Sequence, residues 1–89
     1  MLEVEWDERK RLANLRKHGV DFADVPFMDW DAATILEDKR FAYPEPRFWA
    51  FGTLRGRLHL AAYCIREGRV RVITFRKANA KEIRRHGKA

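Results

Sequence analysis

The alternation of apolar and polar residues at the start of the chain predicts a short strand and then a helix. Residues 2–6 alternate apolar with acidic side chains, as a half-exposed strand does. Asp7 suits the N-cap of a helix that runs to about His18, where a glycine follows. Leu12 and Leu15, three positions apart, are the expected apolar side of this helix.

The next segment predicts a second short helix, one strand and a loop. The helix is expected to begin near Asp21, with Pro26 tolerated in its first turn and with Phe27 and Met28 facing the core. A short strand is expected at residues 33–37. Two prolines beyond that strand favour an extended, exposed loop.

From Arg47 onward the pattern indicates a meander of strands and a final helix. Turns that contain Gly56 and Gly68 separate three apolar strands. The sequence Asn79-Ala80-Lys81-Glu82 fits a capping box in which the asparagine caps the helix. The expected strands cover residues 48–53, 59–65 and 70–75.

This order of elements predicts an α+β fold of two layers. An N-terminal strand and two helices would pack on an antiparallel β-sheet, with a short C-terminal helix at the end. No repeat or linker interrupts the sequence, so residues 1–89 are expected to form a single domain.

The composition favours a soluble protein of the cytoplasm. Of the 89 residues, 46% are hydrophobic, which is enough for a core. Cys64 is the one cysteine, so no internal disulfide can form and a reducing compartment is the natural setting. No apolar run approaches the roughly 18 residues of a membrane span, and MLEVEWDERK lacks the layout of a signal peptide. No membrane association is expected.

Charge is divided unevenly along the chain. The net charge at pH 7 is +6, but residues 1–46 carry −4 and residues 47–89 carry +10. This asymmetry points to a polyanion, either nucleic acid or an acidic protein, as the partner of the basic half. A solvated surface whose charges only maintain solubility is the alternative.

Residues 69–86, RVRVITFRKANAKEIRRH, bring candidate groups together where a strand passes into a helix. Arg76 at the strand end is the main candidate for binding a phosphate, because a guanidinium offers two parallel donors and keeps its charge. Lys77 would point to the opposite face if the strand continues to it. Glu82 and His86, four apart on the helix, could form a carboxylate–imidazole pair for proton transfer, although Glu82 also fits the capping box and His86 the helix dipole.

Further basic residues are candidates for contacts with a phosphate backbone, with solvated surface charge or helix capping as the alternative. His59 alternates onto the same face as Tyr63, which favours a half-buried structural position. Cys64 is expected to be buried, and no close metal-ligand spacing occurs, so neither a metal site nor a cofactor is expected. The backbone-contact candidates are Arg55, Arg57, Arg84, Arg85, Lys17 and His18.

Three separated stretches together resemble one family. The sequences EWDERKRLANLRKHGVDFADV, RGRLHLAAY and ITFRKANAKEIRRH are similar to those of the BrnT toxins, and the resemblance covers nearly the whole chain. It implies a RelE-like fold and a ribonuclease that cuts RNA, inhibits translation and arrests growth. It also implies a BrnA antitoxin, a ribbon-helix-helix protein that neutralises the toxin and represses the shared operon. Operator DNA would be reached only through that antitoxin.

On this resemblance we expect a metal-independent endoribonuclease in which the 2′-hydroxyl attacks the adjacent phosphate. Arg76 would stabilise the phosphoryl charge, and His86, paired with Glu82, or a neighbouring base would move protons, with Lys77 as a further catalytic candidate. Family members often carry a tyrosine where this chain has His86.

Two aromatic residues are candidate antitoxin contacts. Trp30, between two aspartates, and Phe27 could anchor an antitoxin segment, with a lid over the core as the alternative for Trp30. The alternative function for the whole chain is a non-catalytic nucleic-acid-binding module or operon co-repressor.

Overall fold

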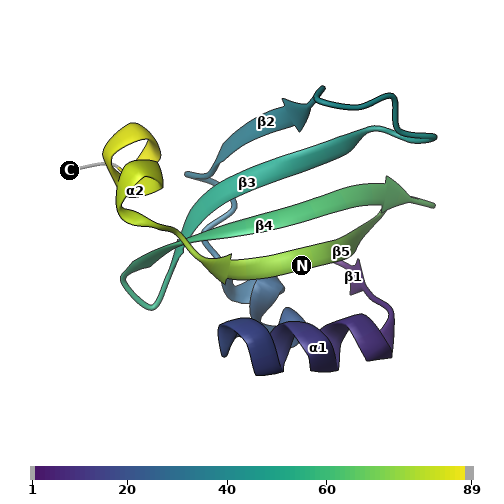
Figure 1. The fold of residues 1–89 in the computed structure, drawn as a ribbon, viewed down its shortest axis with the longest axis horizontal. Helices are drawn as coiled ribbons and strands as arrows, with labels where there is room; N and C mark the ends of the chain where they lie inside the picture. Colours follow the sequence, from purple (N-terminus) through teal and green to yellow (C-terminus); the bar gives the residue numbers. More distant parts are fainter. Residues whose placement is uncertain (1, 88–89) are drawn as a thin grey trace.

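The computed structural model describes residues 2–87 and confirms an α+β fold of two layers around a five-stranded sheet (Figure 1). The strands lie in the order β1-β5-β4-β3-β2. Neighbouring strands are antiparallel except for β1, which runs parallel to β5, so the sheet is mixed where an antiparallel one was predicted. The elements are β1 (Val4–Glu5), α1 (Glu8–His18), the 3₁₀ helix η1 (Phe22–Phe27), β2 (Thr34–Asp38), β3 (Arg47–Leu54), β4 (Arg57–Arg66), β5 (Arg69–Lys77) and α2 (Ala80–His86).

Local sequence determines where the helices begin and end. At the start of α1, Asp7 Oδ1 accepts hydrogen bonds from two backbone N–H groups of the first turn, at 2.9 and 3.3 Å. Gly19 ends α1 in the left-handed conformation, with φ of 70°. The predicted capping box of α2 is present: Asn79 Oδ1 accepts from the N–H of Glu82 at 2.8 Å, and Glu82 Oε1 accepts from the N–H of Asn79 at 2.9 Å.

The main core lies between the sheet and the layer formed by α1 and η1. Phe22 of η1 and Phe75 of β5 are fully buried there, and burial of each contributes about 2–3 kcal/mol. A smaller apolar cluster lies on the other face of the sheet, where α2 stands. It consists of Phe51, Leu58, Leu60 and Ala78, with the partly exposed Trp49 beside them.

The buried side of α1 differs from the prediction. Leu12 and Leu15 are exposed, and the buried residue of this helix is Asn14. The reason is that Asn14 faces β5 and hydrogen-bonds to the backbone of Phe75. A polar side chain therefore joins the helix to the sheet.

The second helix is a 3₁₀ helix, and its geometry explains why one predicted core residue is wrong. Residues three apart lie on the same face of a 3₁₀ helix, and this places Phe22, Val25 and Met28 in the core. Phe27 falls on another face and is 64% exposed, although the sequence pattern placed it inside.

Candidate functional site

Two consecutive cations at the end of β5 project to opposite sides of the sheet. Strand pairing with β4 continues to Lys77, which lies opposite His59. Arg76 therefore lies on the side of α2, where it lines a hollow with Glu82. Lys77 lies on the side of η1 and lines a cleft with His59. The strand thus places two predicted catalytic residues in two different sites.

Glu82 holds Arg76 in a bidentate ion pair. Arg76 Nη1 and Nη2 lie 2.8 and 2.9 Å from the two carboxylate oxygens of Glu82. The hydrogen bonds between the two side chains are the main cause that lowers the pKa of Glu82 and raises the pKa of Arg76. Nη1 also donates to the carbonyl oxygen of Lys77 at 3.2 Å. Glu82 is therefore ionised at neutral pH, and its carboxylate orients Arg76.

The imidazole of His86 packs on Phe51. The two ring centroids are 4.1 Å apart and the ring planes are tilted by 21°. The carboxylate of Glu82 binds Arg76 and the N–H of Asn79, and within residues 2–87 no hydrogen bond joins it to His86. The carboxylate–imidazole pair expected from the spacing of four residues is therefore not formed in this conformation.

A groove crosses the sheet on the side of α2. Two adjoining hollows, of about 330 and 280 Å³, share Trp49, Phe51 and Glu82. The guanidinium carbon of Arg40 lies 4.8 Å from the centre of the Trp49 ring. An aromatic floor with cations beside it suits single-stranded RNA, because bases stack on rings and phosphates pair with cations. We call this surface the α2-side groove and define it by Arg40, Trp49, Phe51, Arg76, Glu82 and His86, with Lys81 and Arg85 also lining it.

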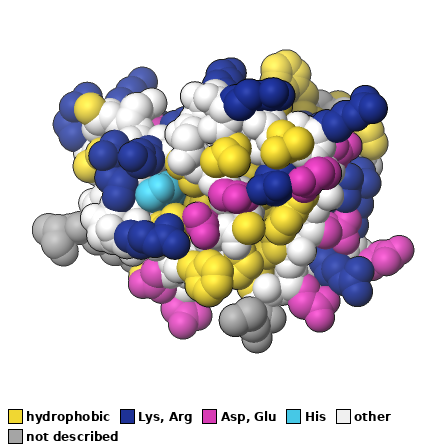
Figure 2. Space-filling view, turned by 90° about the horizontal axis from the view of Figure 1, so that it is seen from below, with side chains coloured by type: hydrophobic (Ala, Val, Ile, Leu, Met, Phe, Trp, Pro, Cys, Tyr) yellow, Lys and Arg dark blue, Asp and Glu magenta, His cyan; other side chains and the backbone are white. Residues whose placement is uncertain are grey.

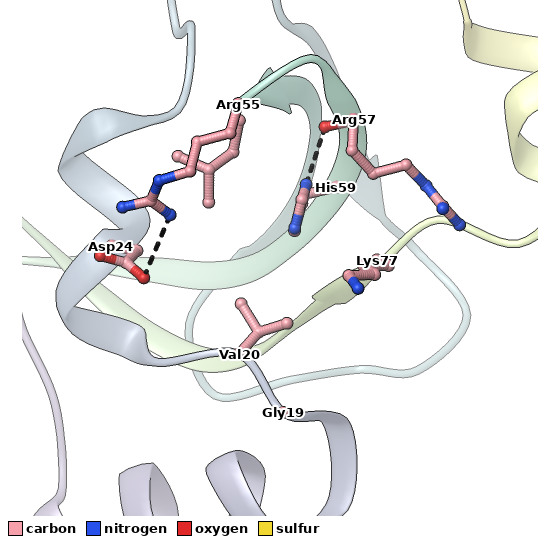
Figure 3. Close-up of a pocket in the computed structure, with 8 residues that line it drawn as sticks. Gly19, Val20, Asp24, Arg55, Arg57, His59 and Lys77 are labelled. Atoms are coloured by element: carbon pink, nitrogen blue, oxygen red, sulfur yellow. Dashed lines mark hydrogen bonds and ion pairs between the residues drawn. The ribbon is translucent and has the colours of Figure 1, made fainter.

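A second cleft, of about 340 Å³, lies on the opposite side of the sheet at the β3–β4 turn (Figure 3). It brings together Arg55, Arg57 and Lys77 with His59, which is only 4% exposed. Burial is the main cause that lowers the pKa of His59. The hydrogen bond to the carbonyl of Arg57 opposes this shift, and the charges of Lys77, Arg57 and Arg55 add to it, so the neutral ring predominates at pH 7. We call this the His59 cleft.

Strand alternation placed His59 on the core face and the structure buries it there, but sequence reasoning did not show that it also lines a cleft. That face ends at the β3–β4 turn, where the core gives way to a cleft. The available signal was the position of His59 two residues after Arg57 and close to a turn glycine.

Lys17 and His18 lie on a third surface, at the end of α1. They line a shallow hollow beside Ile73 and Thr74 of β5. Burial, followed by the charges of Lys17 and Arg76, lowers the pKa of His18. The predicted RNA contacts are therefore spread over surfaces that each include residues from the second half of β5.

Ion pairs neutralise many cations of the basic half. Within residues 2–87, Arg55, Arg66, Arg69 and Arg71 pair with Asp24, Glu45, Glu3 and Glu5 respectively. Cations without an ion-pair partner in that range include Arg57, Lys77, Lys81, Arg84 and Arg85, which lie around the β5–α2 junction. Figure 2, viewed from the side of α1, shows Lys and Arg side chains on both the left and the right of this face.

The two predicted antitoxin contacts differ in exposure. Trp30 Nε1 donates to the carbonyl oxygen of Val25 at 2.8 Å, and its ring meets Tyr63 edge-on with centroids 5.4 Å apart. Trp30 therefore packs against the core, as the lid alternative described. Phe27 is largely exposed and has an aromatic face open to a partner.

Three further findings concern the described part of the chain. No group of three or more His, Cys, Asp and Glu side chains within residues 2–87 is arranged to hold a metal ion. None of the helices there has the length and apolar character needed to cross a membrane. Cys64 is buried and free, as predicted.

Comparison with known proteins decides the family. The family model described as ribonuclease toxin, BrnT, of type II toxin-antitoxin system matches residues 6–82. This chain belongs to the BrnT family. No curated protein matches it.

A solved BrnT structure has a similar fold. The crystal structure of the Brucella abortus ribonuclease toxin, BrnT, superposes with a TM-score of 0.70 at 28% sequence identity. The match covers 89% of this chain and 99% of that one. Membership of the BrnT family makes this chain a ribonuclease toxin of a type II toxin–antitoxin system, which acts on RNA and is partnered by an antitoxin.

Proposed function

We propose that this BrnT-family chain is an endoribonuclease that cleaves RNA in the α2-side groove without a metal ion. The observation that carries the proposal is the position of Arg76, held by Glu82 beside the aromatic floor. Of the five N–H donors of Arg76, three bind Glu82 and the carbonyl of Lys77, so two remain for a phosphate. Arg76 can therefore bind a phosphoryl oxygen while the ion pair still orients it.

In the proposed reaction the 2′-hydroxyl of one nucleotide attacks the adjacent phosphorus. The bond from phosphorus to the 5′-oxygen of the next nucleotide breaks, which leaves a 2′,3′-cyclic phosphate and a free 5′-hydroxyl. The 2′-hydroxyl loses a proton and the 5′-oxygen gains one, so a group that accepts and returns a proton is needed. His86 is suited to this role, because its imidazole lines the groove.

The test is cleavage of a short RNA by the wild type, Arg76→Ala and Arg69→Ala, each with and without excess EDTA. Arg76→Ala should lower the cleavage rate about 10²–10³-fold, as removal of one donor to a transition-state charge does. Arg69→Ala removes an exposed arginine that pairs with Glu3, far from the groove, and should cleave like the wild type. Circular dichroism spectra should show that all three proteins are folded.

The possible results separate the parts of the proposal. Equal rates for the wild type and Arg76→Ala would remove Arg76 from the reaction, and loss of cleavage in EDTA would overturn metal independence. RNA binding without cleavage would identify the alternative, a nucleic-acid-binding module or operon co-repressor. Cleavage also predicts a bell-shaped pH profile, whereas binding alone depends mainly on salt.

The physiological proposal follows from the family. Cleavage of cellular RNA would inhibit translation in the cytoplasm, and a BrnA-like ribbon-helix-helix antitoxin would block it. Operator DNA would be bound through the antitoxin. The exposed ring of Phe27 at the end of η1 supports an aromatic anchor for that partner.

A further inference from the structure

The His59 cleft is built by segments that are distant in sequence. The β3–β4 turn contributes Arg55, the first residues of β4 contribute Arg57 and His59, and the end of β5 contributes Lys77. Gly19 and Val20, which follow α1, form another wall (Figure 3). With a volume of about 340 Å³, the cleft has room for a group larger than a single water molecule.

One ring nitrogen of His59 has a partner and the other faces the cleft. Nδ1 lies 2.8 Å from the carbonyl oxygen of Arg57. A carbonyl oxygen accepts a hydrogen bond, so Nδ1 carries the proton and Nε2 of the neutral ring is left with its lone pair. No fully buried side-chain nitrogen or oxygen within residues 2–87 lacks a hydrogen-bond partner. Nε2 has no hydrogen-bond partner in that range, so it cannot be fully buried. It is therefore accessible from the cleft, where Figure 3 shows the ring.

The charges around the cleft favour an anion. Arg55 is 3.5 Å from Asp24, so one of the three cations is already paired. Arg57 donates to the carbonyl oxygen of Ala78 at 3.1 Å, a bond that holds the guanidinium at the edge of the cleft, just past the end of β5, and leaves its charge uncompensated (Figure 3). Lys77 is exposed at the end of β5. Three cations against one carboxylate leave a net charge of +2, which exceeds the partial negative charge, about half an elementary charge, at the carboxyl end of α1.

We propose that the His59 cleft binds a phosphate group of the RNA substrate, one that flanks the phosphate held by Arg76. Arg57 and Lys77 supply the positive charge, and the bound anion favours the protonated ring of His59, whose Nε2–H then donates a hydrogen bond to a phosphate oxygen. The assignment of RNA as the ligand rests on the function proposed above.

The position of the cleft explains why the phosphate would belong to the same RNA strand. Arg76 and Lys77 are consecutive residues whose side chains leave β5 on opposite faces of the sheet. A strand that passes over the end of β5 therefore meets the α2-side groove on one side and the His59 cleft on the other. Binding on both sides would fix the register of the RNA on Arg76.

The first experiment measures binding of a 2′-O-methyl RNA, which cannot be cleaved by 2′-hydroxyl attack, at several salt concentrations by fluorescence anisotropy. Lys77→Ala should bind roughly 3- to 10-fold more weakly than the wild type, and the slope of log K against log salt should be smaller by about 0.7, the value for one lost phosphate contact on a single strand. Lys39→Ala is the matched control, because this exposed lysine of the β2–β3 loop lines neither the His59 cleft nor the α2-side groove.

The second experiment follows the imidazole nitrogens of His59 by NMR in the wild-type protein, which avoids a substitution at a buried residue. The Nε2 signal should shift when the 2′-O-methyl RNA is added. A shift with an RNA that lacks a 5′-phosphate would assign the cleft to an internal phosphodiester, and a shift only with a 5′-phosphorylated RNA would assign it to a terminal phosphate. Inorganic phosphate serves as the probe for the isolated group.

The outcomes for the cleft and for the catalytic proposal are distinguishable. If the wild type cleaves RNA but Lys77→Ala keeps wild-type affinity and salt slope, and the His59 signals do not move, the inference about the cleft is wrong and the proposed function stands. If Lys77→Ala binds more weakly and His59 responds but no cleavage occurs, the cleft is an RNA site and the catalytic proposal fails.

Discussion

Replacement of Asn14 by alanine is predicted to lower the free energy of unfolding by about 3 kcal/mol. β1 pairs with Val70 and Arg71, and beyond that point no strand among residues 2–87 lies beside the outer edge of β5. At Phe75 the side-chain amide of Asn14 takes the place of a strand. Its Oδ1 accepts from the N–H of Phe75 at 3.2 Å, and its Nδ2 donates to the carbonyl oxygen of Phe75 at 2.7 Å.

The magnitude follows from the hydrogen bonds that end at this amide. Nδ2 also donates to the carbonyl oxygen of Val20 at 3.0 Å, and Oδ1 accepts from Thr74 Oγ1 at 3.3 Å. Each bond contributes about 1 kcal/mol net, and the groups of Phe75 left unpaired add to the loss unless water reaches them. Alanine has a better helix propensity than asparagine, and this reduces the loss of stability by about 0.5–0.7 kcal/mol. The net loss in the free energy of unfolding is therefore about 2–4 kcal/mol. This is a large part of the total stability of a domain, which is typically about 5–15 kcal/mol.

The assay is equilibrium unfolding in urea, followed by far-UV circular dichroism. Asn14→Ala should lower the midpoint without changing the m value, because the surface exposed on unfolding is nearly the same. Thr74→Val, which removes only the longest of the four bonds, should cost at most about 1 kcal/mol. A loss below about 1 kcal/mol for Asn14→Ala would refute the reasoning that its amide replaces a strand partner.

Stability should also fall as the pH is lowered from about 7.5 to 5.5, since ordinary histidines titrate near 6.5. The folded chain lowers the pKa of His59 and His18, so near and below the ordinary histidine pKa the unfolded chain binds more protons than the folded chain, and stability present at higher pH is lost. A urea midpoint that stays constant or rises as the pH is lowered would contradict this prediction. For the antitoxin, Phe27→Ala should weaken binding of a cognate BrnA-like protein by about tenfold or more in calorimetric titration. Phe41→Ala is the control, because Phe41 is 66% exposed but lies in the β2–β3 loop; equal affinities of the two variants would exclude Phe27 from the interface.

The ends of helices could be predicted from the sequence because capping is a local matter. Asp7, Asn79 and Glu82 hydrogen-bond to backbone groups two or three residues away, so neighbouring sequence is enough to recognise them. The turn glycines Gly56 and Gly68 have φ of 78° and 76°, conformations that side chains disfavour. Both kinds of prediction agree with the structure.

The packing of the helices could not be predicted in the same way. The spacing of Leu12 and Leu15 indicated an apolar side of α1, but the residue that α1 buries is Asn14, whose partner Phe75 is 61 positions away. The parallel pairing of β1 with β5 likewise depends on a contact between the two ends of the chain. Hydrophobic periodicity carries no information about such long-range partners.

The candidate site was predicted as a set of residues, but its geometry was not. Alternation along a strand predicted that Arg76 and Lys77 lie on opposite faces of the sheet if the strand continues to residue 77. β5 does continue to Lys77, and the two side chains lie on opposite faces. The choice between two partners for Glu82 needed the structure, because the capping box and the i, i+4 pair with His86 have equal support in sequence. The carboxylate completes the capping box and also binds Arg76, because the turn between β5 and α2 brings the two partners together.

The arrangement of ion pairs explains how a fold with an acidic N-terminal half presents a basic surface. Acidic residues of β1, of the segment just before it and of the loop before β3 lie at the β4–β5 turn, where they neutralise Arg66, Arg69 and Arg71. At the opposite end of β5, Arg76 pairs with Glu82, but Lys77 and the neighbouring Arg57 and Lys81 have no ion-pair partner within residues 2–87, and a positive potential concentrated there would attract RNA. Arg76 and Lys77 leave the sheet on opposite faces at that same end. The fold therefore separates charge by strand end rather than by sheet face, and this is the arrangement expected if one RNA strand passes over the end of the sheet and contacts both faces.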